Sequence, residues 1–277
     1  METIIIIIIA IIIGFASAFV GSLVGLGGGI VFVPAMLFLY KYFDAYAWAS
    51  AQTIVGISLI TMVFTGLSST VAYMKLKRVD IQTGVLFLFG SIPGSIAGSW
   101  VNSQVDADSF SLYFGILMFV VLLMMMIDRE KIAGKRQLTI TDKTRNFTIE
   151  GELFQYNVPV IPAFILSFFV GALSGLFGIG GGTISVPALI LFFGMPVQIA
   201  IATSMFMIFF ISMMSSVSHI VLGHIVWTYV IFFVIGSYVG GTVGAKTNKR
   251  LKGRTLEWIL RIVIGFTAIQ LIYEGLR

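Results

Sequence analysis

A series of apolar stretches, each about as long as a lipid bilayer is thick, constrains the fold of this chain more than any other feature. A helix needs about 20 apolar residues to cross roughly 30 Å of hydrocarbon. Hydrophobic residues make up 58% of the 277 residues and charged residues only 10%, against roughly 25% in a soluble domain. We therefore predict an all-α integral membrane protein in a lipid bilayer, with spans at residues 4–25, 47–74, 83–101, 109–127, 159–178, 198–222, 226–245 and 256–273.

The first stretch could also be a secretory signal, because Ala16-Ser17-Ala18 resembles a signal-peptidase site. Signal peptides normally begin with basic residues, whereas this one carries Glu2 and no Lys or Arg. The same segment also has a counterpart later in the chain. We expect the first stretch to remain as a membrane helix.

Two further apolar pieces are too short to cross a membrane. Ile30–Tyr40 and Thr183–Phe193 would each extend about 16 Å as a helix, roughly half of the hydrocarbon thickness. Each directly follows a triple glycine, Gly27–Gly29 or Gly180–Gly182. We predict two half-helices, each preceded by a glycine-broken loop.

One long polar segment separates the chain into two halves. It predicts a first transmembrane repeat at residues 1–127, a cytoplasmic link at 128–157 and a second repeat at 158–277. Within the link, the alternation at residues 138–141 predicts a β-hairpin. The sequon Asn146-Phe147-Thr148 falls in the same link, so we expect no glycosylation.

The two halves repeat the same sequence pattern. Gly21–Leu26 aligns with Gly171–Leu176 and, after a three-residue deletion in the first copy, Gly27–Ala35 aligns with Gly180–Ala188. Further on, each half has three glycines spaced four residues apart, a spacing that lets helix backbones approach closely. The two sets are separated by a constant offset of 146 residues. These are Gly90, Gly94 and Gly98, and Gly236, Gly240 and Gly244.

The positions of the basic residues predict the topology. If each half-helix turns the chain back, each repeat has about five membrane segments, and the odd number makes the two repeats inverted. Fourteen of the 17 Lys and Arg then lie on one side, in Lys75–Arg78, the central link and Lys246–Arg254. Because cytoplasmic loops are enriched in basic residues, both termini are predicted outside.

The second repeat resembles a known family. Gly-Leu-Phe-Gly-Ile-Gly-Gly-Gly-Thr-Ile-Ser-Val-Pro-Ala-Leu at 175–189, Gly-Met-Pro at 194–196 and Ala-Ile-Ala-Thr-Ser at 200–204 are similar to the TauE/SafE sulfite exporter family of permeases. The first repeat departs from the motif, because it lacks Phe-Gly-Ile and has no clear Ala-Thr-Ser after Pro34. The resemblance implies transport of a small sulfur-containing or organic anion, such as sulfite or a sulfonate, across a bacterial or archaeal inner membrane.

The glycine loops are the predicted anion site. Unwound backbone inside a membrane is tolerated only where it is buried in protein or lines a wet cavity. Glycine allows a ligand to approach, and the start of a helix offers free N–H groups with a partial positive charge. Inversion would bring both positive ends together near the midplane. A tight turn with close packing is the alternative reading of the same residues, Gly27, Gly28, Gly29, Gly180, Gly181, Gly182 and Thr183.

Hydroxyl and amide side chains are the other candidates for contacting the substrate. Thr203 and Ser204 match the family pattern; their counterpart in the first copy is either Gln52-Thr53 or, at the offset of 146, Ile57-Ser58. Such side chains often bond to their own helix instead. Four hydroxyls are weaker candidates, and two prolines are expected to bend the half-helices: Ser69, Thr70, Ser215 and Ser216, and Pro34 and Pro187.

Few ionisable residues lie within the apolar stretches, where they are costly and often functional. Glu257 and Arg261 are four residues apart and are expected to pair. His219 and His224 could carry a proton in a coupled cycle or serve a structural role.

The composition excludes most enzyme classes. The chain has no Cys and only two His, so thiol chemistry and the usual metal sites are absent, and we expect no cofactor. The basic residues lie between apolar stretches, which argues against nucleic-acid binding. We predict a secondary transporter of a small anion with alternating access; an anion channel and a non-transporting assembly partner are the alternatives. Proton or sodium coupling and a homodimeric state are left open.

Overall fold

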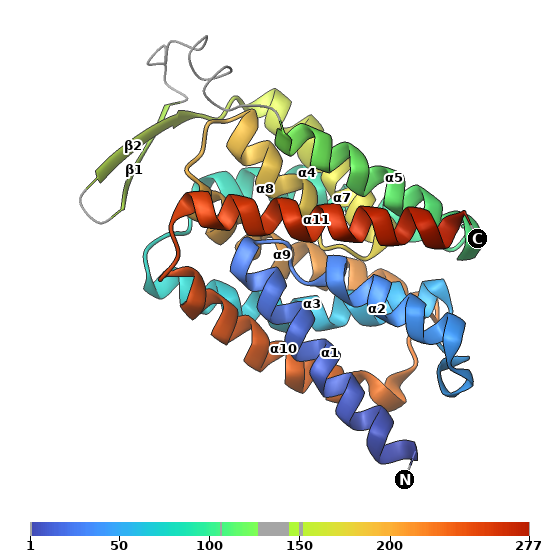
Figure 1. Cartoon of the computed structure of the whole chain (residues 1–277). Coiled ribbons are helices and arrows are strands. Elements are labelled where there is room, and N and C mark those ends of the chain that lie inside the picture. Colours follow the sequence, from blue (N-terminus) through green and yellow to red (C-terminus); the bar gives the residue numbers. More distant parts are fainter. Residues whose placement is uncertain (1, 106, 127–143, 150–151, 277) are drawn as a thin grey trace.

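The computed structural model describes residues 2–105, 107–126, 144–149 and 152–276 (Figure 1). Within these residues the regular elements are α-helices, one two-stranded hairpin and a short 3-10 helix at Asp44–Tyr46. The elements are α1 (Glu2–Val24), α2 (Gly29–Tyr42), α3 (Ala51–Lys75), α4 (Ile81–Asn102), α5 (Ala107–Met126), β1 (Thr144–Ile149), β2 (Glu152–Asn157), α7 (Val160–Phe177), α8 (Gly182–Leu191), α9 (Val197–Val221), α10 (Trp227–Asn248) and α11 (Gly253–Gly275).

Seven of the described helices are long and apolar enough to cross a membrane. The apolar part of α5 is slightly shorter, at Phe110–Met126. The two half-helices are confirmed as short elements, because α2 has 14 residues and α8 has 10. The span predicted at about residues 47–74 is found at Ala51–Lys75, with a later start. The α3 helix begins at Ala51 because the Ser50 side chain caps it, accepting a hydrogen bond from the Thr53 N–H at 3.3 Å.

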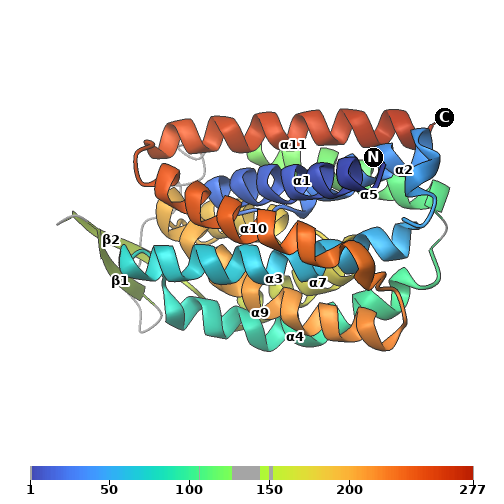
Figure 2. The same cartoon turned by 90° about the horizontal axis from the view of Figure 1, so that it is seen from below.

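The connections between helices gather at two opposite ends of the molecule. Figures 1 and 2 show both chain termini at one end and the β-hairpin at the other. The α3–α4 and α10–α11 connections, which contain the basic clusters Lys75–Arg78 and Lys246–Arg254, lie at the hairpin end. The basic connections therefore share one end, opposite the termini.

Glycines allow close backbone contacts between α1 and α10 and between α4 and α7. A methyl group at Gly94 or Gly98 would overlap a backbone carbonyl of α7, and one at Gly240 or Gly244 would overlap a carbonyl of α1. Their spacing of four residues therefore serves backbone packing.

The hairpin is attached to the start of α4. Its strands pair antiparallel with Ile149 opposite Glu152. The Tyr156 hydroxyl donates to Asp80 Oδ2 at 2.6 Å, and Asp80 caps α4 by accepting the Thr83 N–H. Burial and the neighbouring Asp80 raise the pKa of Tyr156, so its hydroxyl stays a donor. The hairpin predicted at residues 138–141 lies outside the described residues, and the sequon falls within β1.

Candidate functional site: two glycine loops at the centre of the helices

Each half-helix begins at a loop of left-handed glycines. In the first loop, between α1 and α2, Gly25, Gly27 and Gly28 have φ values of 80°, 86° and 106°. In the second, between α7 and α8, Gly178, Gly180 and Gly181 have φ values of 68°, 66° and 75°. Side chains other than glycine rarely adopt this conformation, so the backbone path itself requires these residues.

The two loops have the same length and the same sequence of conformations. The left-handed residue after α1 is Gly25, and the one after α7 is Gly178. The sequence alignment instead placed Gly25 opposite Gly175, which lies inside α7, and required a three-residue deletion. Backbone conformation pairs Gly25 with Gly178, and no deletion is needed.

Free backbone donors lie at the start of both half-helices. In α2 the first helical hydrogen bonds are donated by Val31 and Phe32 to Gly28 O, so the N–H groups of Gly29 and Ile30 precede them. In α8, Ile184 and Ser185 donate the first bonds to Gly181 O. The Thr183 hydroxyl at this terminus is fully buried and has no hydrogen-bond partner.

The two loops contact each other directly. A Cβ atom on Gly29 would overlap the carbonyl oxygen of Gly178, and one on Gly182 would overlap the carbonyl oxygen of Gly25. The two loops therefore touch in this structure, with no room for a methyl group at either position.

Serine hydroxyls secure each loop from the helix next to it. Ser58 of α3 donates to Gly178 O at 2.8 Å, and Ser204 of α9 donates to Gly25 O at 2.9 Å. Of the two first-copy alternatives for Thr203-Ser204, the one containing Ser58 therefore lies at a glycine loop.

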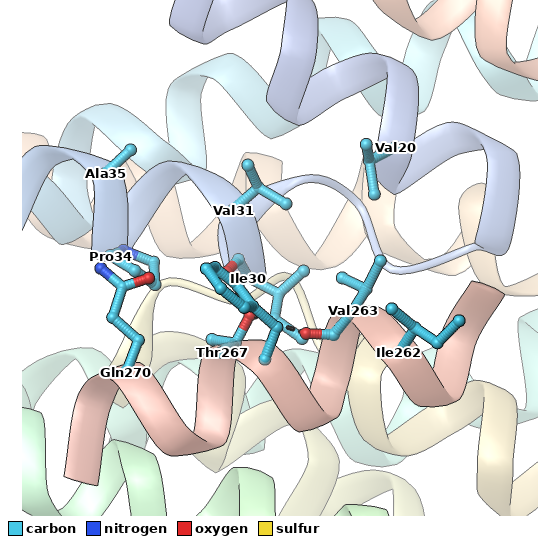
Figure 3. A pocket seen from close by; sticks show the side chains of 10 residues that line it. Val20, Ile30, Val31, Pro34, Ala35, Ile262, Val263, Thr267 and Gln270 are labelled. Atoms are coloured by element: carbon cyan, nitrogen blue, oxygen red, sulfur yellow. Dashed lines mark hydrogen bonds between the residues drawn. The ribbon is translucent and has the colours of Figure 1, made fainter. Parts of the chain in front are cut away.

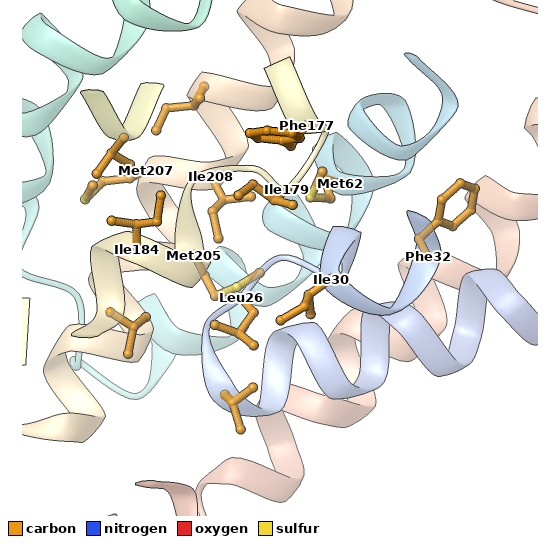
Figure 4. Close-up of a cluster of buried hydrophobic side chains, with 14 of the residues drawn as sticks. Leu26, Ile30, Phe32, Met62, Phe177, Ile179, Ile184, Met205, Met207 and Ile208 are labelled. Carbon is orange, nitrogen blue, oxygen red and sulfur yellow. The ribbon is translucent and has the colours of Figure 1, made fainter. Parts of the chain in front are cut away.

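Apolar side chains fill the space around the loops. Met62 Sδ and Ile208 Cγ2 would each lie 3.1 Å from a Cβ atom on Gly27, and the same two side chains border Gly180. Met62 and Ile208 lie near the middle of α3 and α9. Leu26 and Ile179, one from each loop, are fully buried in the same cluster (Figure 4). The loops thus meet at mid-depth, sealed by apolar contacts.

Three of the predicted site residues have other partners. Gln52 Nε2 donates to Val105 O at 3.0 Å, and Thr53 lies in the capped first turn of α3. The Thr203 hydroxyl accepts the backbone N–H of Asp80 at 3.0 Å, joining α9 to the start of α4. The structure brings the six glycines, Thr183, Ser58 and Ser204 to the two loops and places Gln52, Thr53 and Thr203 elsewhere.

Two hydroxyls near the second loop were missed by sequence reasoning. The Ser212 hydroxyl oxygen lies 3.4 Å from the Cβ position of Gly180 and has no hydrogen-bond partner. Ser185, in the first turn of α8, is also buried without a partner. Serine is common within membrane helices, so only the contact with the loop distinguishes Ser212.

An apolar pocket of about 340 Å³ lies between α1, α2 and α11 (Figure 3). Pro34 has no N–H to offer the carbonyl of Ile30, four residues earlier. The Thr267 hydroxyl of α11 lies 3.4 Å from that carbonyl and 2.9 Å from Val263 O. The pocket therefore borders the proline-interrupted part of α2.

Arg261 and His219 have partners outside the two loops. The guanidinium carbon of Arg261 is 5.5 Å from the centroid of the Trp258 ring. His219 is fully buried in the last turn of α9. Its Nδ1 lies 2.9 Å from His224 Nδ1 and its Nε2 lies 3.2 Å from Gly175 O. Partial burial lowers the pKa of His224.

Known proteins are similar to this sequence over nearly its whole length. Residues 10–271 match the family model described as "Sulfite exporter TauE/SafE". The "Probable membrane transporter protein YunE" of Bacillus subtilis is 42% identical over 272 residues, which cover 97% of this chain and 98% of that protein. A "Probable membrane transporter protein" of Xylella fastidiosa is 25% identical over 270 residues, covering 95% and 92%. The "Probable membrane transporter protein MJ0441" of Methanocaldococcus jannaschii is 26% identical over 273 residues, covering 92% and 91%. No solved structure matches the chain significantly.

Proposed function

Because the chain belongs to the TauE/SafE family of membrane transporters, we propose that it carries a small anion, sulfite or a related sulfonate or organic anion, by alternating access. The observation that carries this proposal is the meeting of two half-helix N-termini at mid-depth. The free N–H groups and the dipoles of α2 and α8 favour negative charge without a cationic side chain. The anion would bind at the two glycine loops, beside Thr183.

We propose that the two halves are inverted repeats. The contacts made by α1 and α10 correspond to those made by α7 and α4, with offsets of 153 for the first helix of each half and 146 for the later helices. Two hydrogen bonds at corresponding positions support this relation. Asn102 Nδ2 donates to Leu176 O at 2.8 Å, and Asn248 Nδ2 donates to Leu23 O at 2.7 Å.

Because the two loops touch, we interpret this structure as a closed state of the transport cycle. Separation of Gly29 from Gly178, and of Gly182 from Gly25, would give an anion access to the free N–H groups. Access from one side and then the other would follow from moving α1–α2 relative to α7–α8. The arrangement of basic connections supports the hairpin end as cytoplasmic and both termini as outside.

Purified protein tests the proposal directly. Sulfite, thiosulfate, sulfoacetate and small carboxylates would be screened for a rise in melting temperature, because a ligand of the native state stabilises it. A stabilising anion should then show saturable flux in proteoliposomes. Flux that does not saturate would favour an anion channel, and no flux for any of these anions would favour a non-transporting membrane partner.

A further inference from the structure

We propose that the His219–His224 pair is a proton-binding site that couples proton movement to transport; this inference rests on the anion transport proposed above. One face of α9 carries the polar side chains of this site. Ser212, Ser215, Ser216 and His219 lie at intervals of three and four residues on α9, so they share a face. The three serine hydroxyls are buried without hydrogen-bond partners.

This face connects the second glycine loop with the end of the molecule that carries the termini. Ser212 borders Gly180, and His219 contacts Gly175 in the last turns of α7. His224 is half-buried in the α9–α10 connection. Hydroxyl groups both donate and accept hydrogen bonds, so water that enters along this face when the loops separate would be held there and would pass protons between the loop and the His pair.

The hydrogen bonds determine where the protons are. A carbonyl oxygen only accepts, so His219 Nε2 carries the hydrogen that reaches Gly175 O. In neutral His219, Nδ1 is then an acceptor, and His224 Nδ1 must be the donor across the 2.9 Å contact. The remaining acceptor is His224 Nε2. One additional proton can bind there without breaking either hydrogen bond.

A second additional proton does not fit this geometry. It would have to bind His219 Nδ1, where it would face the N–H of His224. The pair therefore binds one proton as a unit. A site with a fixed capacity of one proton is suited to a fixed stoichiometry of coupling.

The charge of the protonated pair has no acidic partner on the helices packed against it. Gly56 of α3 and Gly175 of α7 contact the pair. The α7 helix has no ionisable side chain, and α3 has only Tyr73 and Lys75, at its opposite end. The α10 helix contributes Tyr229, which stacks on Trp48, with Tyr238 and Lys246 farther along. Asp106 and Asp108, after α4, lie outside the described side chains. Among the described side chains of these helices none is acidic, so in this proposal the transported anion supplies the counter-charge.

The corresponding face in the first half has no such site. At the offset of 146, Tyr73 corresponds to His219, and its hydroxyl donates to Ser22 O at 2.8 Å, as His219 does to Gly175. Ser69, which corresponds to Ser215, donates to Ser22 Oγ at 2.7 Å. A phenol is already protonated at physiological pH and takes up no further proton. The two halves share the helix contact, but only the second can bind a proton.

The test uses the full chain in sodium-free vesicles of phosphatidylethanolamine and phosphatidylglycerol, with labelled sulfoacetate as the anion and pyranine inside as the pH indicator. The wild type should move protons together with sulfoacetate, and the apparent affinity for sulfoacetate should change by up to about tenfold per pH unit, as expected for one linked proton. His219→Gln and His224→Gln should lower proton movement at least tenfold. Tyr73→Phe is the matched control and should retain it.

A second measurement separates this inference from the proposed function. The chain has only two histidines, so selective nitrogen-15 labelling of the histidine rings reports the pair alone. The spectrum should show His219 protonated at Nε2, His224 at Nδ1, and uptake of one proton. Independent titration of both rings, sulfoacetate flux without proton movement, or flux that requires sodium would overturn the inference. Absence of flux for every anion tested, with the pair still binding one proton, would overturn the proposed function and the coupling with it.

Discussion

The contact between the glycine loops predicts that a single methyl group in either loop stops the transport cycle. Gly29 is the first residue of α2 and has a helical conformation, so alanine is not penalised by the backbone there. Alanine even favours a helix over glycine by about 1 kcal/mol. The new Cβ atom, however, would overlap Gly178 O and lie 2.8 Å from Ile179 Cα, both backbone atoms of the opposite loop.

The expected cost follows from overpacking. Gly182→Ala is the reciprocal change, with its Cβ atom overlapping Gly25 O and lying 2.6 Å from Ile208 Cδ1. Forcing a methyl group into a well-packed core costs about 1–3 kcal/mol, more than the gain in helix propensity. We expect both variants to unfold at lower temperature and to lose anion flux, because the loops can no longer close.

Gly253→Ala is the matched control. Gly253 is the first residue of α11, as Gly29 is of α2, but its Cβ atom would lie 3.6 Å from the nearest atom, an ordinary contact. This variant should remain within about 0.5 kcal/mol of the wild type. The assays are thermal unfolding of the purified protein and flux in proteoliposomes. Wild-type melting temperature and flux in Gly29→Ala and Gly182→Ala would refute the role of the loop contact.

Three further predictions concern the loop hydroxyls, the topology and the pH dependence of stability. Ser58→Ala and Ser204→Ala each leave a buried loop carbonyl without its hydroxyl donor, so thermal unfolding should show a loss of about 1–3 kcal/mol, and unchanged stability in both would contradict the assigned bonds. Single cysteines at Ser103 and Thr247 should differ in intact cells, with an impermeant thiol reagent labelling only Ser103→Cys; labelling of Thr247→Cys would reverse the orientation. Because folding lowers the pKa of His224, the unfolded chain binds more protons, so stability should fall as pH drops below about 6.5 and level off below the folded pKa. His224→Gln should flatten this part of the plot of melting temperature against pH. An unchanged slope of that plot would exclude His224 as the source of the pH dependence.

The sequence predicts the membrane helices well because hydrocarbon thickness imposes a length on them. The short helices α2 and α8 were found for the same reason, since each is too short to cross and follows a glycine run. Partners of polar side chains could not be predicted. Thr203 and Ser204 are adjacent, yet Thr203 accepts the N–H of Asp80 while Ser204 reaches a glycine loop. Which face of α9 meets which helix is decided by tertiary packing.

Conformation also explains why the sequence alignment failed at the first loop. Matching Gly25 with Gly175 aligns identical letters, but Gly175 lies within α7, where it allows close approach to the Ser95 carbonyl of α4. Gly178 ends α7 in a left-handed conformation, as Gly25 does after α1. A glycine required for packing and one required for a positive φ are the same letter with different physical roles. The conformational role is the one that identifies corresponding positions.

The same correspondence, taken with the proposed proton site, predicts where the two halves differ in function. The position occupied by Tyr73 in the first half and by His219 in the second bonds to a backbone carbonyl of the first long helix of its half, α1 or α7, so the structural role is common to both. What differs is the capacity to bind a proton. Mutating Tyr73 should therefore affect stability alone, whereas mutating His219 should also change the pH dependence of transport. If Tyr73→Phe altered that pH dependence as strongly as His219→Gln, the difference between the halves would lie in packing, and the proton site would have to be sought elsewhere.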